Sequence, residues 1–202
     1  MAGSNASRPT GSFPILFGNR WRARGLDQAI ASVDPDALSA EYAALGESAP
    51  RRSLAGKPYF VRHAGVVSAA GAINRLEEHC AIVLVNLGRR WPRRDGGWFR
   101  LLDYQVPLKA RQADARIGKI DLLGVTDKGR LMIVELKVAG PDGRRSDAPP
   151  AALHEGLRYA AIVEADLEAI AGEAERRFGT KIERLPPIVQ LLAPVSWLAA
   201  LV

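Results

Sequence analysis

The sequence is poor in the residues that several common kinds of functional site require. Cys80 is the only cysteine, so the chain can form no internal disulfide and no cysteine-rich zinc or iron–sulfur site. His79 has no companion at metal-ligand spacing, which favours a structural role. The chain also has no G-x-S-x-G element, no evident Cys–His pairing and no Walker A loop. Neither a covalent serine or cysteine hydrolase nor an ATPase is therefore indicated.

Long apolar runs are absent as well. No stretch approaches the roughly 18 residues of a membrane span, and no signal peptide is visible. We expect a cytoplasmic protein with no membrane partner. The 202 residues, 48% of them hydrophobic and 25% charged, are enough for one domain with a substantial core. The net charge of +6 allows an anionic partner but does not establish one.

Residues 118–138, GKIDLLGVTDKGRLMIVELKV, are the stretch around which the chain is organised. They predict two strands joined by a tight turn at 126–129, because Asp and Gly favour turns and both flanks are rich in Ile, Leu and Val. The second strand contains an unbroken apolar run at 131–134, which indicates a central strand buried on both faces.

This buried strand nevertheless carries Glu135 and Lys137, which share a face because side chains alternate along a strand. Asp121 is equally unexpected in the first strand, and antiparallel pairing about the turn would bring it close to Glu135. A surface hairpin with a Glu–Lys ion pair is the plain alternative. The apolar run and Asp121 favour a functional site, because charges are seldom buried without a partner or a ligand.

A cluster of carboxylates with an ammonium suits a divalent cation. Mg²⁺ prefers oxygen ligands, commonly one or two carboxylates together with water and substrate phosphate. A neighbouring lysine can orient the attacking water and offset charge on a phosphoryl oxygen. The sequence therefore predicts a metal site between these two strands.

Asp121, fourteen positions before the Glu135-Leu136-Lys137 triplet, resembles the first acid of the PD-(D/E)xK nuclease motif. The stretches GKIDLLGV and GRLMIVELKV are similar to the RecB-like and archaeal Holliday-junction-resolvase-like branches of that superfamily. Ile120 stands where the family has Pro, a departure that many members share. The resemblance covers residues from about 66 to 194, although only the central motif is specific.

The resemblance implies an α/β protein with a restriction-endonuclease-like αβββαβ core, in which helices flank a mixed central sheet. The order of elements expected from the residue pattern is also helix, three strands, helix and strand. The implied activity is Mg²⁺-dependent hydrolysis of phosphodiester bonds, with Mn²⁺ as a possible substitute and DNA favoured over RNA. The catalytic residues would be Asp121, Glu135 and Lys137.

The metal ligands would be Asp121, Glu135, the carbonyl of Leu136 and Glu77. Glu77 lies on the apolar stripe of a helical pattern at 66–87, where an inward carboxylate is a feature of the family; a glutamate at the border of the helix is the alternative. The rival function is a non-catalytic nucleic-acid-binding module on a nuclease-like fold. A purely structural or protein-binding role would leave the central charges unexplained.

Positive charge is concentrated in residues 86–120, where nine basic and three acidic residues account for the whole net charge. Aromatic residues are interleaved with them, and the combination can grip phosphates and stack on unpaired bases. Solvated arginines beside a core strand would give the same pattern. We expect a basic loop at 89–94 and a strand at 98–108. The candidate contacts to nucleic acid in this stretch are Arg89, Arg90, Arg93, Arg94 and Lys119.

A helix is expected at 151–172 and a last buried strand at 187–193. The RecB-like branch often has Gln-x-x-x-Tyr in this helix, and this chain has Glu155-Gly-Leu-Arg-Tyr159. The match adds Arg158 and Tyr159 as candidate nucleic-acid contacts, with a packing tyrosine as the alternative. The preceding segment 139–150 is expected to be a loop, either a flap that carries arginines towards substrate or a plain connector.

Residues 1–65 are expected to be a flexible tail and an accessory N-terminal region, with a short helix at 36–45 after Pro35. Residues 66–202 would form the PD-(D/E)xK nuclease-like domain. The chain ends on the apolar segment SWLAALV, which would pack on the core or in a homodimer, or would show that the chain is truncated at its C-terminus.

Overall fold

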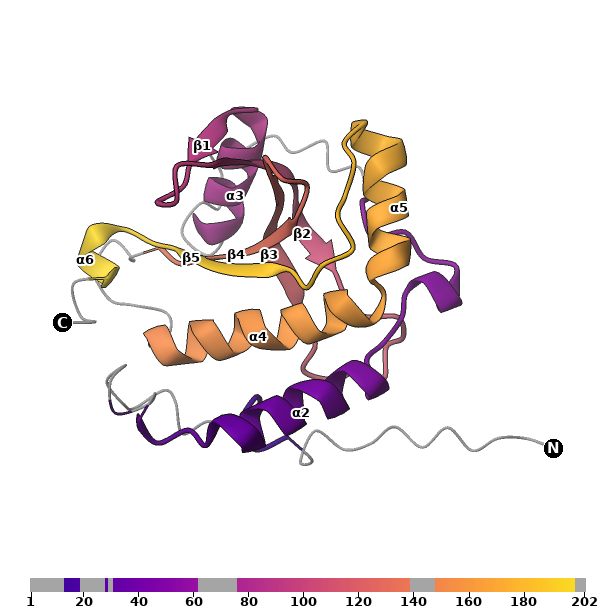
Figure 1. Ribbon diagram of the computed structural model, residues 1–202, viewed down its shortest axis with the longest axis vertical. Coiled ribbons are helices and arrows are strands. Elements are labelled where there is room, and N and C mark those ends of the chain that lie inside the picture. Colours follow the sequence, from indigo (N-terminus) through magenta and orange to yellow (C-terminus); the bar gives the residue numbers. More distant parts are fainter. Residues whose placement is uncertain (1–12, 19–27, 29–30, 62–75, 139–147, 199–202) are drawn as a thin grey trace.

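The computed structural model describes residues 13–18, 28, 31–61, 76–138 and 148–198. A five-stranded sheet with helices on both faces forms the centre of the molecule (Figure 1). The strands are β1 (Arg90–Pro92), β2 (Trp98–Pro107), β3 (Lys119–Thr126), β4 (Leu131–Leu136) and β5 (Ile188–Leu192). The helices are α2 (Pro35–Ser48), α3 (Leu76–Asn86), α4 (Pro149–Ala165), α5 (Leu167–Phe178) and α6 (Val195–Leu198), with a 3₁₀ turn, η3, at Ser53–Ala55.

The strands lie in the order β1-β2-β3-β4-β5. The first four are antiparallel, and β5 returns parallel to β4 after the chain has passed through α4 and α5. A parallel return of this kind needs a crossover connection, which these helices supply. The expected α/β class and mixed sheet are confirmed, and α3, β2, β3, β4, α4 and β5 follow one another in the expected order.

The central hairpin forms where the sequence predicts it. Gly129 adopts a φ of 79°, and its amide donates to the carbonyl of Thr126 at 2.9 Å. All six residues of β4 are buried, as the apolar run indicates. The hairpin therefore places charged residues at the end of a strand that has no solvent-exposed face.

Each face of the sheet packs against a different helix. Leu123, Val125 and Ile133 pack with residues of α4 and α5, whereas Leu122 and Val134 pack with Ala81 and Ile82 of α3. On the outer side of α4 lies α2, where the hydroxyl of Tyr42 donates to Glu164 at 2.9 Å (Figure 1). The helix expected at 36–45 is therefore present, and it packs against the helix that covers the sheet.

Two expectations for local structure are wrong. The segment 89–94 is not a plain loop, because β1 pairs with the start of β2 along the edge of the sheet. The helix expected at 151–172 is interrupted at Asp166, where α4 ends and α5 begins. The carboxylate of Asp166 accepts hydrogen bonds from Ser53 and Tyr59, contacts that are distant in sequence. The pattern at 66–87 is helical from Leu76 onwards, and its earlier part lies outside the described residues.

The C-terminal segment is helical over its described part, and Trp197 is buried. No helix among the described residues has both the length and the apolar character needed to cross a membrane.

We predict that Gly156→Ala lowers the free energy of unfolding by about 1–3 kcal/mol, the usual cost of overpacking. A Cβ at position 156 would lie 2.4 Å from Cγ1 of Val189 in β5, so α4 could not keep its distance from the sheet. Gly172→Ala in α5 is the matched control. Its Cβ would meet only the far end of Arg176 at 3.4 Å, and alanine favours a helix by about 1 kcal/mol. Chemical denaturation measures both variants; equal effects would contradict the close packing of α4.

Candidate active site

The structure brings Asp121 and Glu135 together across β3 and β4. The register pairs Leu122 with Val134, and one step further along the two strands Asp121 lies opposite Glu135. Side chains on paired strands share a face when they lie opposite one another. Glu135 faces α4, because a Cβ at Gly156 would lie 3.5 Å from its Cγ, and Asp121 lies beside it at the same end of the two strands.

Asp121 is half-buried and held by hydrogen bonds to both of its oxygens. The backbone amide of Leu136 donates to Oδ2 at 3.1 Å, and the side-chain amide of Gln105 donates to Oδ1 at 3.2 Å. The donors come from β4 and β2, the two neighbours of β3. The orientation of this carboxylate is therefore set by three adjacent strands.

Glu135 and Lys137 are almost completely buried, at 1% and 4% exposure. The ammonium of Lys137 lies 3.8 Å from Oε2 of Glu135 and 3.7 Å from Oε2 of Glu155 in α4. Oε1 of Glu135 has no hydrogen-bond partner among the described residues. An orphaned buried carboxylate oxygen is costly and requires an explanation, such as a missing ion or water.

The electrostatics of the site follow from burial and crowding. Burial raises the pKa of Asp121 to about 6, although Lys137 and the Leu136 amide act in the opposite direction. Burial, followed by the charge of Asp121, raises the pKa of Glu135 well above its usual range. Burial alone would lower the pKa of Lys137, but the carboxylates around it, Glu135 first, outweigh burial and raise the pKa. The cluster thus holds more negative charge than its lysine compensates.

Glu155 lies at the outer side of this cluster and is 28% exposed at its side chain. The hydroxyl of Tyr159 donates to its Oε1 at 2.8 Å, and a guanidinium nitrogen of Arg158 lies 3.7 Å from the same oxygen. The tyrosine fits because residue 118 is glycine: a Cβ there would lie 2.3 Å from the hydroxyl. Glu155 is thereby fixed beside Lys137.

The sequence also proposed Arg158 and Tyr159 as nucleic-acid contacts, and in the structure both side chains contact other residues of the protein. Tyr159 is only 4% exposed, which leaves its ring no face for a base. Arg158 donates to the carbonyl of Leu16 at 2.5 Å and lies over the ring of Phe17, 4.9 Å from its centroid. Both side chains join α4 to its surroundings and support Glu155.

Glu77 lies in the first turn of α3 and is half-buried. Its charge contributes to the raised pKa values of Asp121 and Lys137, although it is a minor contributor to each. The helix on the opposite face of the sheet therefore brings a further carboxylate towards the same end of β3 and β4.

The described residues contain no group of three or more His, Cys, Asp or Glu side chains arranged to hold a metal ion. The donors that the site does offer are Asp121, Glu135 and the nearby carbonyl of Leu136. Mg²⁺ commonly takes one or two carboxylates and keeps several waters, so this donor set fits it and does not fit a fully protein-ligated cation. The orphaned oxygen of Glu135 supports the fit.

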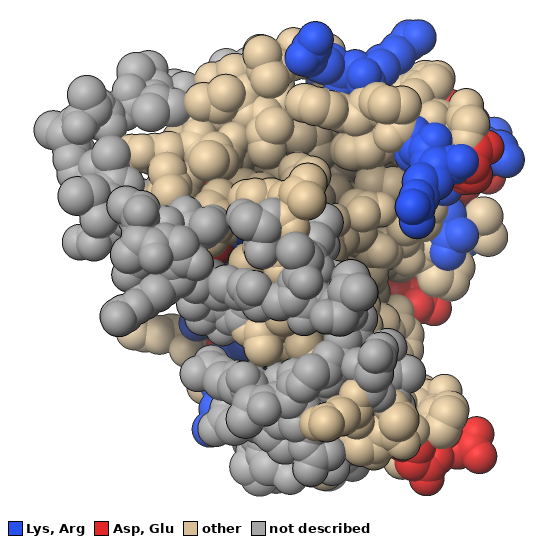
Figure 2. All heavy atoms as spheres, turned by 90° about the vertical axis from the view of Figure 1, so that its left-hand side faces the viewer, with Lys and Arg blue, Asp and Glu red and all other residues tan. Residues whose placement is uncertain are grey.

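The basic residues proposed as nucleic-acid contacts in residues 86–120 lie in two separate regions of the structure. Lys119 is exposed and lies two residues before Asp121, at the end of β3 that carries the carboxylates. Arg89, Arg90, Arg93 and Arg94 flank or form β1, which pairs with the other end of β2. In the face shown in Figure 2, Lys and Arg side chains gather towards the top, the end at which β1 lies in Figure 1.

Several of these arginines are already engaged. Arg90 lies over the ring of Trp98, 4.4 Å from its centroid, and Arg93 pairs with Asp95 at 2.6 Å. Stacking on tryptophan leaves the edge of a guanidinium free to bind an anion, whereas an ion pair neutralises its charge. Arg144 and Arg145, on the expected flap, lie outside the described residues.

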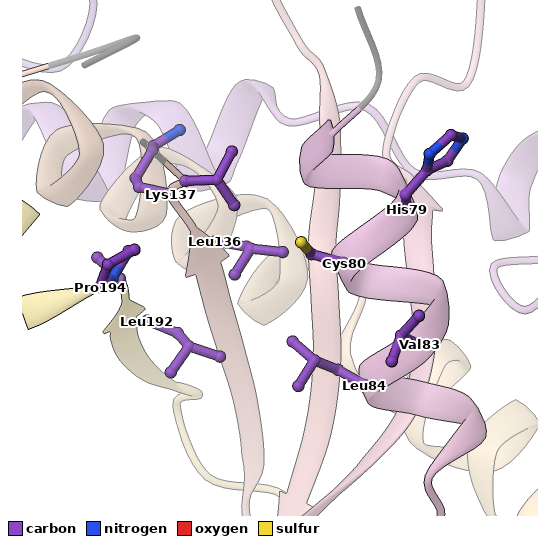
Figure 3. A pocket seen from close by; sticks show the side chains of 10 residues that line it. His79, Cys80, Val83, Leu84, Leu136, Lys137, Leu192 and Pro194 are labelled. Atoms are coloured by element: carbon purple, nitrogen blue, oxygen red, sulfur yellow. The ribbon is translucent and has the colours of Figure 1, made fainter. Parts of the chain in front are cut away.

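An apolar groove of about 440 Å³ adjoins the carboxylate cluster (Figure 3). Cys80 and Leu84 of α3 line one side, and Leu136 and Leu192 line the other. Lys137 lies at the end of the groove with its ammonium directed away from the leucines (Figure 3). Burial in this apolar setting, together with the charge of Glu77, raises the pKa of the Cys80 thiol, so the cysteine is not an activated nucleophile.

Sequence reasoning missed Gln105 and gave Glu155 no part in the charge cluster. Gln105 lies in an ordinary-looking strand, and its proximity to Asp121 depends on the register of β2. The spacing of Glu155 and Tyr159 indicated that they share a face of the helix, but the contact of that face with Lys137 is a tertiary feature.

Comparison of the chain with models of protein families, with curated proteins and with solved structures finds no match. The geometry of the site therefore carries the functional argument.

We predict that Glu135→Gln stabilises the metal-free protein by roughly 1–3 kcal/mol at pH 8, the scale of burying a poorly satisfied polar group. Glu135 titrates above its usual range in the folded state, so its ionised form opposes folding at high pH. As the pH falls through the raised pKa values, the folded state takes up protons that the unfolded chain does not, and the penalty disappears. For Asp121 this window runs from about 6 down to 3.8.

The gain from Glu135→Gln should therefore shrink as the pH is lowered, which denaturation in EDTA at several pH values measures. The groups that set the local field are Asp121, Lys137, Glu155, Glu77 and Arg158. Glu183→Gln, at a 44% exposed side chain paired with Lys181, is the control and should change stability by less than about 0.5 kcal/mol. A loss of stability in Glu135→Gln at pH 8 would contradict the prediction. It would show that the ion pair with Lys137 stabilises the fold by more than burial of the Glu135 charge destabilises it.

Proposed function

We propose that this protein is a metal-dependent nuclease of the PD-(D/E)xK type, built on a restriction-endonuclease-like core and acting on phosphodiester bonds. One observation carries the proposal: Asp121 and Glu135 lie opposite each other at the end of a buried hairpin, beside the buried ammonium of Lys137, and one oxygen of Glu135 has no hydrogen-bond partner among the described residues. Desolvating such a cluster is costly, and a cation at the carboxylates would offset that cost.

The residues present suit phosphodiester hydrolysis. Asp121, Glu135 and the Leu136 carbonyl would hold Mg²⁺ or Mn²⁺, with Glu77 as a further candidate ligand. The bound ion would lower the pKa of a coordinated water, and its own positive charge would stabilise the phosphoryl oxygens. Lys137 remains protonated at neutral pH, so it can donate hydrogen bonds to the attacking water or to a phosphoryl oxygen. Attack of the water on phosphorus would break a P–O bond, and the leaving oxygen would take up a proton.

The exposure of the site residues indicates the side from which a substrate would reach them. Glu135 and Lys137 are buried, whereas Asp121 and Glu155 are partly exposed. A phosphate would therefore approach from the side of Asp121, where exposed Lys119 also lies. The arginines of β1 would bind the nucleic acid away from the bond that is cleaved. DNA is the substrate that the resemblance favours, and the location of such an enzyme would be the cytoplasm.

The alternative is a nucleic-acid-binding module on the same fold that does not cleave. The basic edge around β1 and its stacked arginine favour it as the second candidate. A module without activity has no need to keep two carboxylates near phosphate, because they repel it. Metal-dependent cleavage therefore accounts for more of the site.

We predict cleavage of labelled single-stranded, double-stranded or branched DNA in Mg²⁺ or Mn²⁺ and none in EDTA, with RNA tested in parallel. Glu135→Gln and Lys137→Gln should each lower the rate by at least about 100-fold while DNA binding is retained. Lys181→Gln, at an 85% exposed side chain, is the control and should cleave normally. Tight binding without cleavage under any metal would favour the binding module, and neither binding nor cleavage would contradict both.

We also predict that the arginines in and beside β1 set the affinity for DNA and not the rate of cleavage. Each phosphate contact contributes about 0.9 to the slope of log affinity against log salt for duplex DNA, so Arg89→Gln with Arg90→Gln should lower the slope by about 2. The rate at saturating DNA should stay unchanged. Arg176→Gln, an exposed arginine on α5, is the control. An unchanged slope in the double variant would place the DNA elsewhere.

A further inference from the structure

Strand β2 contains an irregularity close to the carboxylate cluster. Leu101 lies opposite Gly124 of β3, whereas Asp103 lies opposite Leu123, the next residue along. Leu102 is therefore an extra residue in β2, a β-bulge. Bulges shift the register of the strand beyond them and often re-aim a side chain next to an active site.

The shift decides which residue of β2 faces Asp121. Beyond the bulge, Tyr104 lies opposite Leu122 and Val106 lies opposite Ile120, which leaves Gln105 opposite Asp121. If the register of Leu101 and Gly124 continued without the bulge, Tyr104 would lie opposite Asp121 instead. Because of the extra residue, the amide of Gln105 and not the phenol of Tyr104 lies beside the carboxylate of Asp121.

Gln105 also has an unusual backbone. Its φ is 49°, and Arg116 is the only other residue besides glycine with a positive φ in the described part of the chain. A left-handed residue inside a strand is uncommon for a side chain other than glycine and is kept only where the surroundings enforce it. Such outliers cluster at functional sites.

The contact that this backbone makes possible is a hydrogen bond from Nε2 of Gln105 to Oδ1 of Asp121, 3.2 Å long. The Leu136 amide holds the other oxygen at 3.1 Å, so each oxygen has one fixed donor. A carboxylate oxygen has two lone pairs, so each keeps one for a cation. An amide adds no positive charge, unlike lysine or arginine, and therefore does not compete with the cation.

We propose that Gln105 is a positioning residue, which the bulge at Leu102 places so that its amide fixes the Asp121 carboxylate for binding a divalent cation. The inference rests on the proposed metal-dependent function. Hydrogen bonds of this outer kind orient the metal ligands, and their loss typically weakens metal affinity 10–100-fold.

The test compares Gln105→Gly with Gln105→Ala, which lose the same donor but differ in backbone strain. Mn²⁺ is titrated into each full-length variant and the wild type, and the dissociation constant and melting temperature are measured. We expect both variants to bind Mn²⁺ about 10–100-fold more weakly. The glycine variant should melt higher than the alanine variant, because only glycine adopts a positive φ freely.

Arg116→Gly is the matched control for the backbone, because Arg116 has a φ of 62° and lies in an exposed segment. It should raise the melting temperature without weakening Mn²⁺ binding. In cleavage assays, high Mn²⁺ should restore the rate of the Gln105 variants towards the wild-type value. A merely structural residue would show no such recovery.

The outcomes separate the two proposals. If the wild type binds Mn²⁺ and both Gln105 variants bind it equally well, the positioning role is wrong and the metal site stands. If Mn²⁺ affinity follows the melting temperature across the variants, Gln105 acts only on stability, which also overturns the role. If the wild type neither binds Mn²⁺ nor cleaves nucleic acid, the proposed function fails and this inference fails with it.

Discussion

Burial of charge at the end of an apolar hairpin is the constraint on which the rest of this structure depends. Glu135 and Lys137 have almost no contact with solvent, and Asp121 lies beside them. Charged groups in such a position destabilise the fold unless they are paired and hydrogen-bonded. Part of this requirement is met by Lys137 itself, by the Leu136 amide, by the side-chain amide of Gln105 in β2 and by the carboxylate of Glu155 in α4, which lies beside Lys137. One oxygen of Glu135 has no hydrogen-bond partner in the part of the chain that the structure describes, and the proposed cation would bind there.

The helix that covers the site is shaped by the same constraint. Gly156 allows α4 to lie against Val189 and close to Glu135, and Gly118 leaves room for the hydroxyl of Tyr159. Both glycines are places where a Cβ would collide with a neighbour. Close packing therefore brings Glu155 next to Lys137 and excludes water from the inner carboxylate. The close packing permitted by these two glycines is therefore also what places the charges of the site next to one another.

The basic edge around β1 and the carboxylate cluster lie at different ends of the sheet. The carboxylates lie where β3 begins and β4 ends, whereas the arginines around β1 lie beside the start of β2. Long-range attraction between basic residues and a polyanion does not need close contact with the reacting bond. Separating the two allows an electropositive edge to coexist with a negatively charged centre.

Local pattern was enough to predict the central hairpin, its turn and the shared face of Glu135 and Lys137, because alternation along a strand and turn chemistry act over a few residues. It was also enough for the α/β class and the order of the elements. It failed at Asp166, where bonds to Ser53 and Tyr59 interrupt a pattern that reads as one helix. It failed again at β1, since pairing with β2 turned a basic loop into an edge strand. Only the tertiary structure decided that Gln105 faces Asp121 and that Glu155 reaches Lys137, because a bulge in one strand and the approach of a helix depend on packing between distant segments.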